Sequence, residues 1–376
     1  MALLMLVLAS AGAIVLVDDL FDLFVFFEIC TIAQVGIVAA VGGERAHSTA
    51  MKYLFLGAIA GAMLLLSMVF LLGSTSVLNI SDMAEIIGGL GLSSPPILLG
   101  FGLLLFAWTY GGGLLPFHAI KSELYGRSLP HAGALLQSTS KLMLIALGLI
   151  LIRLFGGFSQ TWIWILVPSL LAMIIGAAMA MVQNDYRRLL AYIAVSQAGV
   201  AGIGFAFYKM VDISGFSGVT FGMFHGFNEI IIASALFISA GYLYSLKGNT
   251  DIRNFGGLLE KKKWFGLLTL ALMLAISGVP PFNTFQSEWR IISLSFQEGY
   301  FPIGILMVLA TVMTFYAVMK AFYAIFLKPS SEKYEGKVPI SITITLVIAL
   351  LLGLIFGIYP QLVMTPMHNA LPAFPP

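Results

Sequence analysis

Long runs of apolar residues, separated by short polar segments, make up almost the whole chain. A helix needs about 20 apolar residues to cross the hydrocarbon core of a bilayer. Stretches of this kind predict membrane spans at residues 2–17, 20–41, 52–73, 96–117, 131–155, 160–182, 188–208, 217–245, 264–298 (interrupted), 301–327 and 338–360. No remaining segment is long enough for a soluble domain. The pattern therefore predicts an all-α polytopic membrane protein with about eleven transmembrane helices.

Composition supports this class and excludes others. Of the 376 residues, 60% are hydrophobic and 10% are charged, whereas soluble domains have about 25% charged residues. The net charge of +2 and the lack of a basic tract argue against a nucleic-acid partner. A single cysteine, Cys30, allows no internal disulfide, CxxC metal site or iron–sulfur ligand set. We therefore expect no metal, no cofactor and no redox chemistry in this chain.

The N-terminal stretch and the distribution of basic residues predict the orientation. Residues 1–20 lack a basic region before the apolar run, so we expect a membrane helix there and not a cleaved signal. The even-numbered loops contain fourteen Lys and Arg residues, among them Lys121 and the run Lys261–Lys263, whereas the other face has about three: Arg153, Lys209 and Arg290. Cytoplasmic loops carry such an excess. We expect a multi-pass protein of the cell membrane with a cytoplasmic N-terminus and an external C-terminus.

Two spans contain residues that break helices. The fourth contains "YGGGLLPFH" and the ninth contains "SGVPPFNTF", which place helix breaks at Gly111, Pro116, Pro280 and Pro281. A broken helix in the membrane is tolerated where protein or a water-filled cavity satisfies its backbone groups. The alternative that the prolines only kink their helices remains open.

The two broken spans occupy equivalent positions along the chain. If the chain is divided near residue 157, each is the fourth helix of a five-helix half. Because five is odd, the two halves have opposite orientations in the membrane, which is typical of transport sites built from inverted repeats. The predicted units are a first repeat (1–157), a second, inverted repeat (158–330) and a C-terminal transmembrane helix with its tail (331–376).

Six ionisable side chains fall inside the predicted spans, where each costs about 2.5–3.5 kcal/mol and usually has a function. The long side chain of Lys320 can reach the interface, so we set it aside. The other five form a candidate proton path: Glu28, Lys141, His225, Glu229 and Glu288. Burial makes the proton affinities of acids and lysines more alike, which favours transfer between them. His225 and Glu229 are four residues apart and therefore lie on one helix face. This spacing suits either a proton-sharing pair or a structural hydrogen bond.

Glu288 follows a double proline in "VPPFNTFQSEWR". We expect the prolines to open the helix so that Glu288 faces a hydrated cavity and passes a proton outwards. The alternative is that Glu288 pairs with Arg290 or with a base of a neighbouring subunit.

Several segments, in chain order, resemble one family. "AMVQNDYRRLLAYIAVSQAG" combines an Asp, a basic pair, Leu-Ala-Tyr and Ser-x-x-Gly at the family's spacing, and "LFVFFEICTIAQ", "AMKYLFLGAIAGA", "LLPFHAI", "HGFNEIIIASALFISAG", "DIRNFGGL" and "SGVPPFNTFQSEW" are similar to further family segments. The family comprises the antiporter-like subunits of respiratory complex I, of multisubunit cation/proton antiporters and of membrane-bound hydrogenases. The Phe-x-Ser-Glu-Trp form most resembles hydrogenase-type members, including archaeal hydrogenases and sulfur-reducing complexes.

The resemblance implies a fourteen-helix fold with inverted repeats, of which this chain is expected to lack the first three helices. By their positions in the motifs, Glu28, Lys141, His225 and Glu288 match the family's fifth-helix glutamate, eighth-helix lysine, eleventh-helix histidine and twelfth-helix exit residue.

Two positions depart from the family pattern. Gly111, next to Tyr110, stands where a lysine would pair with the glutamate. Ala233 stands where another lysine is expected, while Glu229 replaces a second histidine. Both losses weigh against full proton pumping.

The leading hypothesis is an antiporter-like membrane-arm subunit that conducts or relays protons or Na⁺ in a redox-driven complex, such as a membrane-bound hydrogenase, a sulfur reductase or a complex I relative. Its partners would be other membrane-arm subunits and the bilayer. The alternative is a non-conducting structural spacer of the same kind of complex. A stand-alone permease would need a polar substrate pocket with convergent side chains, which the sequence does not indicate.

Overall fold

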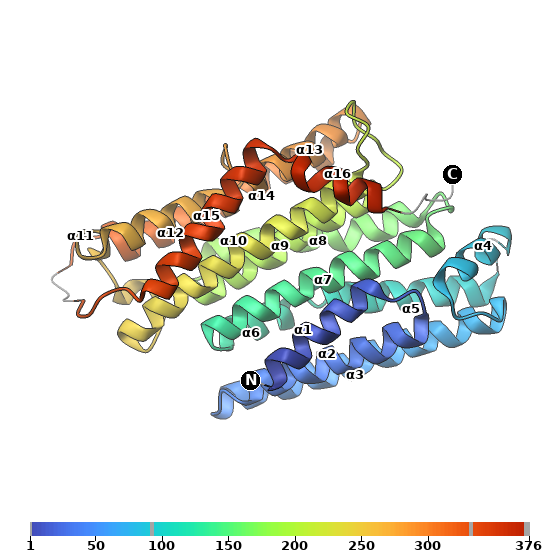
Figure 1. Cartoon of the computed structure of the whole chain (residues 1–376), viewed down its shortest axis with the longest axis horizontal. Coiled ribbons are helices and arrows are strands. Elements are labelled where there is room, and N and C mark those ends of the chain that lie inside the picture. Colours follow the sequence, from blue (N-terminus) through green and yellow to red (C-terminus); the bar gives the residue numbers. More distant parts are fainter. Residues whose placement is uncertain (1, 91–93, 331–333, 372–376) are drawn as a thin grey trace.

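The computed structural model describes residues 2–90, 94–330 and 334–371, and in these ranges it is built from helices that lie roughly along one axis (Figure 1). The first half contains α1 (Ala2–Leu16), α2 (Leu20–Ala39), α3 (Glu44–Thr75), α4 (Ile80–Leu90), α5 (Pro95–Gly112), α6 (His118–Arg127) and α7 (Pro130–Phe155). The rest contains α8 (Thr161–Val182), α9 (Tyr186–Ala206), α10 (Gly218–Lys247), η1 (Ile252–Asn254), α11 (Leu258–Lys261), α12 (Lys263–Ile276), α13 (Asn283–Gln297), α14 (Phe301–Phe322), the π-helical turn η2 (Tyr323–Leu327), α15 (Ile340–Ile358) and α16 (Gln361–Ala370).

The polytopic all-α class is confirmed, but the count of eleven spans is not. Within the described residues, nine helices are long and apolar enough to cross a membrane. Helices α1, with 15 residues, and α12, with 14, lie within predicted spans but are shorter than a full crossing. In α12 the shortfall arises because the chain breaks and continues as α13.

The two halves share a backbone arrangement at opposite ends of the molecule. In the first half, the turn before α2 pairs with the segment before α4: the Leu20 N–H donates to Leu78 O (3.1 Å) and the Ile80 N–H to Asp18 O (2.9 Å). Asp19 caps α2 by accepting the backbone N–H groups of Phe21 and Asp22. This junction therefore fixes the start of α2 against the loop that follows α3.

The second half repeats this junction. The Tyr186 N–H donates to Thr250 O (2.8 Å), the Ile252 N–H donates to Asn184 O (2.8 Å), and Asp185 caps α9. Helices α4 and α11, which follow the two junctions, lie at opposite ends in Figure 1. This is the relation expected of inverted repeats, while the boundaries at residues 157 and 330 stay a prediction, as does the membrane orientation.

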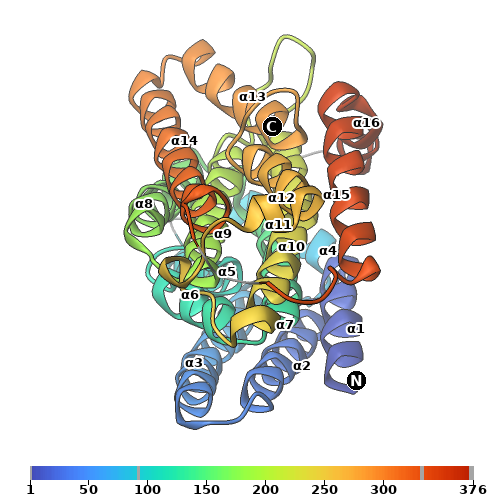
Figure 2. The same cartoon turned by 90° about the vertical axis from the view of Figure 1, so that its left-hand side faces the viewer.

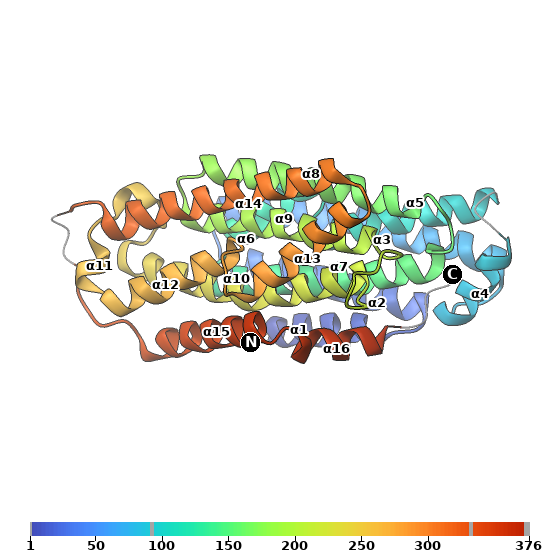
Figure 3. The same ribbon diagram turned by 90° about the horizontal axis from the view of Figure 1, so that it is seen from above.

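Helix α9 forms the centre of the bundle. All of its residues from Leu189 to Ala206 are buried. Glycines make this possible, since a Cβ at Gly199 would lie 2.4 Å from Ser169 O and one at Gly204 would lie 2.6 Å from Gly222 Cα. Seen end-on in Figure 2, α1–α3 lie at the bottom and α13–α14 at the top, with α9 and α10 between them. From above, α1, α15 and α16 run along one edge and α8 and α14 along the other (Figure 3).

The first helix break separates α5 from α6. Helix α5 ends at Gly112, and Gly113 adopts a left-handed backbone conformation with φ +75°, which glycine accepts without steric cost. The break at Gly111 is therefore wrong by two residues: Gly111 lies in the last turn of α5, while Pro116 lies within the break as predicted.

The second break, between α12 and α13, has the same form. Gly278 has φ +67°, and its N–H donates to Ala275 O (3.1 Å). Pro280 and Pro281 lie between the two helices as predicted. Both breaks contain a cis prolyl bond, at Leu115–Pro116 and at Pro280–Pro281. In each case a second helix follows the break: α6 continues α5, and α13 continues α12.

Candidate functional site

A buried ion pair joins the two halves of the chain. Lys141 of α7 and Glu229 of α10 place Nζ and Oε2 3.2 Å apart, with side-chain exposures of 2% and 0%. Lys141 also donates a hydrogen bond to the carbonyl of Ala194 (2.5 Å) in α9. Neither oxygen of Glu229 accepts a hydrogen bond from the described residues. Electrostatic attraction to one lysine therefore accounts for the position of this carboxylate.

His225 lies one helical turn before Glu229 on α10 and connects to the second broken helix. Its Nε2 donates to Gln197 Oε1 (2.9 Å), and its Nδ1 lies 2.9 Å from Ser287 Oγ. Gln197 in turn donates through Nε2 to Ile276 O (2.9 Å), the last residue of α12, which fixes the orientation of its amide. Neither sequence alternative for this pair describes the structure, because His225 and Glu229 each take a different partner.

Glu288 lies on α13, one turn after the break, and is 3% exposed. Its Oε1 accepts a hydrogen bond from the Thr311 hydroxyl (2.6 Å), and its Oε2 has no hydrogen-bond partner among the described residues. A hollow of about 170 Å³ adjoins the carboxyl group, between α13 and α14. The pairing with Arg290 is wrong: Arg290 Nη1 lies 3.1 Å from Asp212 Oδ2.

Glu28 lies apart from these groups. It is half-buried on α2 and faces α3, where a Cβ at Gly61 would lie 1.5 Å from its Oε1. The glycine therefore makes room for the carboxyl group. Gly111, the family's lysine position, packs against α7, where its Cβ would lie 3.1 Å from Leu147 and 3.3 Å from Met143. Ala233, the other departure, is buried on α10.

Lys121 belongs to the site, although the sequence places it in a cytoplasmic loop. That placement is wrong, because Lys121 is 0% exposed on α6, the second arm of the first broken helix. Its Nζ donates to the Tyr53 hydroxyl (2.9 Å) and to Ser140 Oγ (3.1 Å). The remaining basic residues still favour the same face. The available signal was its position five residues after Pro116, within reach of the membrane interior.

Further polar groups missed from the sequence continue the network towards α2. The Tyr53 hydroxyl donates to Gln34 Oε1 (2.6 Å), and Gln34 Nε2 donates to Thr139 Oγ1 (2.9 Å). Ser140 precedes Lys141 on α7, and Ser287 precedes Glu288 on α13. Buried polar and ionisable groups thus form one row from α2 through α7 and α10 to α14.

One further lysine in the predicted spans lies outside this row. Lys320 of α14 donates to Met181 O and Gln183 O (2.6 Å each), so it caps the end of α8. Among the described residues, no three His, Cys, Asp or Glu side chains come together in a way that could hold a metal.

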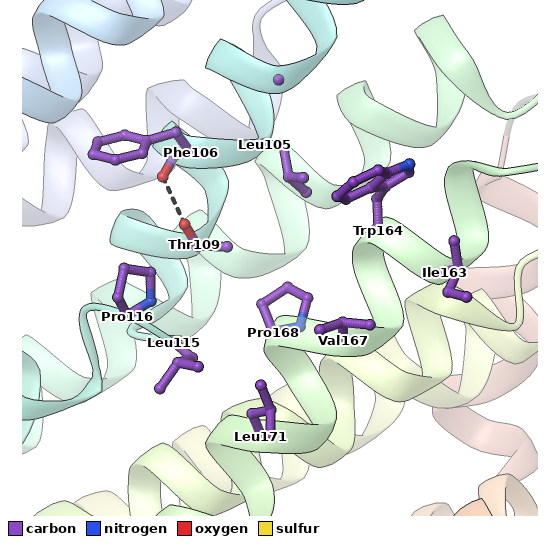
Figure 4. Close-up of a pocket in the computed structure, with 11 residues that line it drawn as sticks. Leu105, Phe106, Thr109, Leu115, Pro116, Ile163, Trp164, Val167, Pro168 and Leu171 are labelled. Carbon is purple, nitrogen blue, oxygen red and sulfur yellow. Dashed lines mark hydrogen bonds between the residues drawn. The ribbon is translucent and has the colours of Figure 1, made fainter.

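A lateral groove of about 510 Å³ lies between α5 and α8, close to the first break. Figure 4 shows that Trp164, Leu171 and Pro168 face Leu105 and Pro116 across it. The hydroxyl of Thr109 in its lining donates a hydrogen bond to Phe106 O (2.8 Å) and is therefore already satisfied. Such a lining suits hydrocarbon and offers no convergent polar groups.

Curated relatives match most of the chain. An uncharacterized protein of Methanocaldococcus jannaschii is 40% identical over 363 residues, which are 94% of this chain and 73% of the relative. A Na⁺/H⁺ antiporter component of Alkalihalophilus pseudofirmus is 26% identical over 319 residues, 84% of this chain and 63% of the relative. A component of the F420H2 dehydrogenase of Methanosarcina mazei is 26% identical over 370 residues, 95% of this chain and 72% of the relative.

Solved structures share the fold. A chain of the membrane-bound sulfane sulfur reductase, an archaeal respiratory membrane complex, superposes with a TM-score of 0.85 at 26% identity over 97% of this chain and 72% of its own length. A chain of the Mrp complex from Dietzia has a TM-score of 0.84 at 20% identity over 96% of this chain and 75% of its own. Residues 17–314 match the family described as NADH:quinone oxidoreductase/Mrp antiporter, transmembrane. The chain therefore belongs to this family of antiporter-like membrane proteins.

Proposed function

We propose that this chain is a membrane-arm subunit that relays protons within a multisubunit, redox-driven complex. The observation that carries the proposal is the row of buried titratable groups across both halves, with the Lys141–Glu229 ion pair at its centre. Ionisable residues at this depth are costly and usually mark ion pathways. A chain that only filled space would be expected to bury apolar side chains at these positions.

The relatives support the setting within a complex. Two of them are named as subunits of a Na⁺/H⁺ antiporter and of an F420H2 dehydrogenase, and a structural neighbour belongs to a sulfur-reducing respiratory complex. We propose other membrane-arm subunits as partners and the cell membrane as the location. The redox reaction would take place in those partners, and this chain would carry the ion.

Each group in the row has a role suited to its contacts. The proton of the central pair can lie on Lys141 or on Glu229, because transfer between the two converts an ion pair into two neutral groups. His225, one turn before Glu229 on α10, contacts Gln197 and Ser287 through its two ring nitrogens and so links α10 to α9 and α13. Glu288 would be the exit, since its Oε2 has no hydrogen-bond partner among the described residues and its side chain lines the hollow of about 170 Å³ between α13 and α14.

The second candidate is a structural spacer, favoured by the two departures from the family pattern. Gly111 and Ala233 carry no charge where lysines are expected, and Glu28 has no ion-pair partner among the described residues. Under this alternative the buried groups would be inherited contacts that hold the helices together.

Transport by the assembled complex in everted membrane vesicles distinguishes the two. Proton movement is followed with a pH-sensitive acridine dye, and a Na⁺ ionophore and a protonophore in parallel samples identify the ion. Glu229→Gln, which keeps the side-chain shape but cannot ionise, should reduce transport by about tenfold or more if Glu229 passes protons. Wild-type transport by Glu229→Gln in a fully assembled complex would support the spacer.

A further inference from the structure

Lys121 is a fully buried cation for which the central ion pair leaves no acidic partner. The described residues place two hydroxyl groups against its Nζ, those of Tyr53 (2.9 Å) and Ser140 (3.1 Å), and no carboxylate. The rings of Tyr53 and Tyr110 lie 5.0 Å from the ammonium group. Neutral oxygens and aromatic faces stabilise a charge less than a carboxylate does. Lys121 therefore lacks the electrostatic stabilisation that Glu229 gives to Lys141.

The fold brings this lysine inward by a specific route. Its aliphatic stem passes over Gly113 at the helix break, where a Cβ would lie 2.9 Å from Lys121 Cγ. The left-handed conformation of Gly113 ends α5 and lets α6 turn back towards the bundle. Tyr110, in the last turn of α5, stacks on Tyr53 with ring centroids 5.5 Å apart, so the two rings lie together beside Nζ. A side chain that only reached for solvent would not take this position.

Lys121 is also connected to the central pair. Ser140 contacts Lys121 and directly precedes Lys141 on α7. Among the described residues, Cys30 of α2 and Lys141 also lie near enough to Lys121 to interact with it electrostatically. A change of charge on Lys121 therefore acts directly on Lys141.

We propose that Lys121 is a proton-binding site of the first half, which loads and releases one proton next to the Lys141–Glu229 pair. On release, one N–H bond of the ammonium group breaks and its proton goes to the Ser140 hydroxyl, which at the same time gives its own proton to a water molecule. Lys121 is then a neutral amine, and uptake reverses these steps. Because two ammonium groups repel each other in a medium of low permittivity, loading Lys121 favours transfer of the Lys141 proton to Glu229. This inference rests on the proposed proton relay and adds a residue to it.

The test compares two polar substitutions, of which only one can bind a proton in the accessible pH range. Lys121→Gln keeps a polar group but cannot titrate, and Lys121→His can titrate, with an ordinary pKa near 6.5 against about 10.4 for lysine. In everted vesicles, Lys121→Gln should reduce proton transport by about tenfold or more. Lys121→His should retain part of it, with the optimum at a more acidic pH. Lys52→Gln, at a lysine with 54% exposure, is the matched control and should transport normally.

Each outcome separates this inference from the proposed function. Wild-type transport by Lys121→Gln, together with a loss in Glu229→Gln, overturns the role of Lys121 and leaves the relay standing. Wild-type transport by both variants overturns both. Equal losses in Lys121→Gln and Lys121→His at every pH, or a complex that fails to assemble in either, would mean that Lys121 is structural. Partial activity in Lys121→His with a shifted pH optimum supports the proposal, because a structural lysine would not produce that shift.

Discussion

Lys141 and Glu229 form an ion pair inside the bundle, and neutralising one partner should cost more stability than neutralising both. At 3.2 Å and an effective dielectric constant of about 20, the Coulomb attraction is about 5 kcal/mol. Removing these ions from water costs several kcal/mol each, so attraction and desolvation nearly cancel. Lys141→Met or Glu229→Gln alone leaves a buried charge unpaired and should destabilise the chain by about 3–5 kcal/mol.

The double variant Lys141→Met/Glu229→Gln removes both charges and should recover most of this loss. The hydrogen bond from Lys141 to Ala194 O is lost in both Lys141 variants, so it does not contribute to the coupling between the two sites. The expected coupling is therefore several kcal/mol, well above the roughly 0.2–1 kcal/mol typical of exposed pairs. Transport should stay low in the double variant, since neither group can then carry a proton. The double variant should thus be nearly as stable as the wild type but inactive in transport.

Thermal unfolding of the detergent-purified complex measures the stability of the wild type, the two single variants and the double variant. The same substitutions at Lys52 and Glu123, a pair with exposures of 54% and 21%, provide the matched control and should show little coupling. Additive losses at Lys141 and Glu229 would refute the reasoning, because they would mean that the two charges do not stabilise each other. Normal transport by a stable double variant would refute the role of the pair in the relay.

Three further predictions concern other parts of the chain. Gly357→Ala should destabilise the chain in thermal unfolding, because a Cβ there would lie 2.0 Å from Pro281 O at the second break. The control Gly73→Ala, where a Cβ meets nothing within 4 Å, should be neutral or stabilising by up to about 1 kcal/mol. Glu288→Gln should reduce vesicle transport more than Glu28→Gln, since Glu288 is almost fully buried and directly follows Ser287, the partner of His225, whereas Glu28 is half-buried and lies apart from the row; the reverse order would assign the main path to the first half. In a Cys30→Ala background, a cysteine at position 368 should react with an impermeant thiol reagent on intact cells and one at position 262 should not; the opposite pattern would invert the orientation.

The architecture was predictable from the sequence because it depends on local patterns. Apolar runs of membrane length place the helices, and glycine and proline place both breaks within two residues. The sequence could not show that α5 continues past Gly111 to Gly112, since three consecutive glycines are equally able to end a helix and only the backbone shows that Gly113 has the positive φ. The count of eleven spans is not confirmed, and for α12 the reason is related: hydropathy does not show where a broken helix stops being helical.

The site was predictable in its residue types but not in its pairings. Charged residues inside apolar runs identified Lys141, His225, Glu229 and Glu288, whose burial the structure shows. The pairings depend on how α7, α9, α10 and α13 pack, which no local pattern encodes. Spacing suggested that His225 and Glu229 act together, yet tertiary contacts assign each to a different helix.

Lys121 was missed because α6 is short and polar enough to look like a loop, and its burial changes the charge balance of the interior. Without it, the nearly fully buried charges among the described residues would be Lys141 against Glu229 and Glu288, an excess of acid. With it, two lysines face two glutamates, and the formal charge is zero when all four are ionised. A balanced set is less costly in a low-dielectric medium than one with a net charge, and a proton that moves from one of these groups to another leaves the total unchanged. The buried row can therefore shift charge along its length without charging the membrane interior, provided that uptake at one end is matched by release at the other.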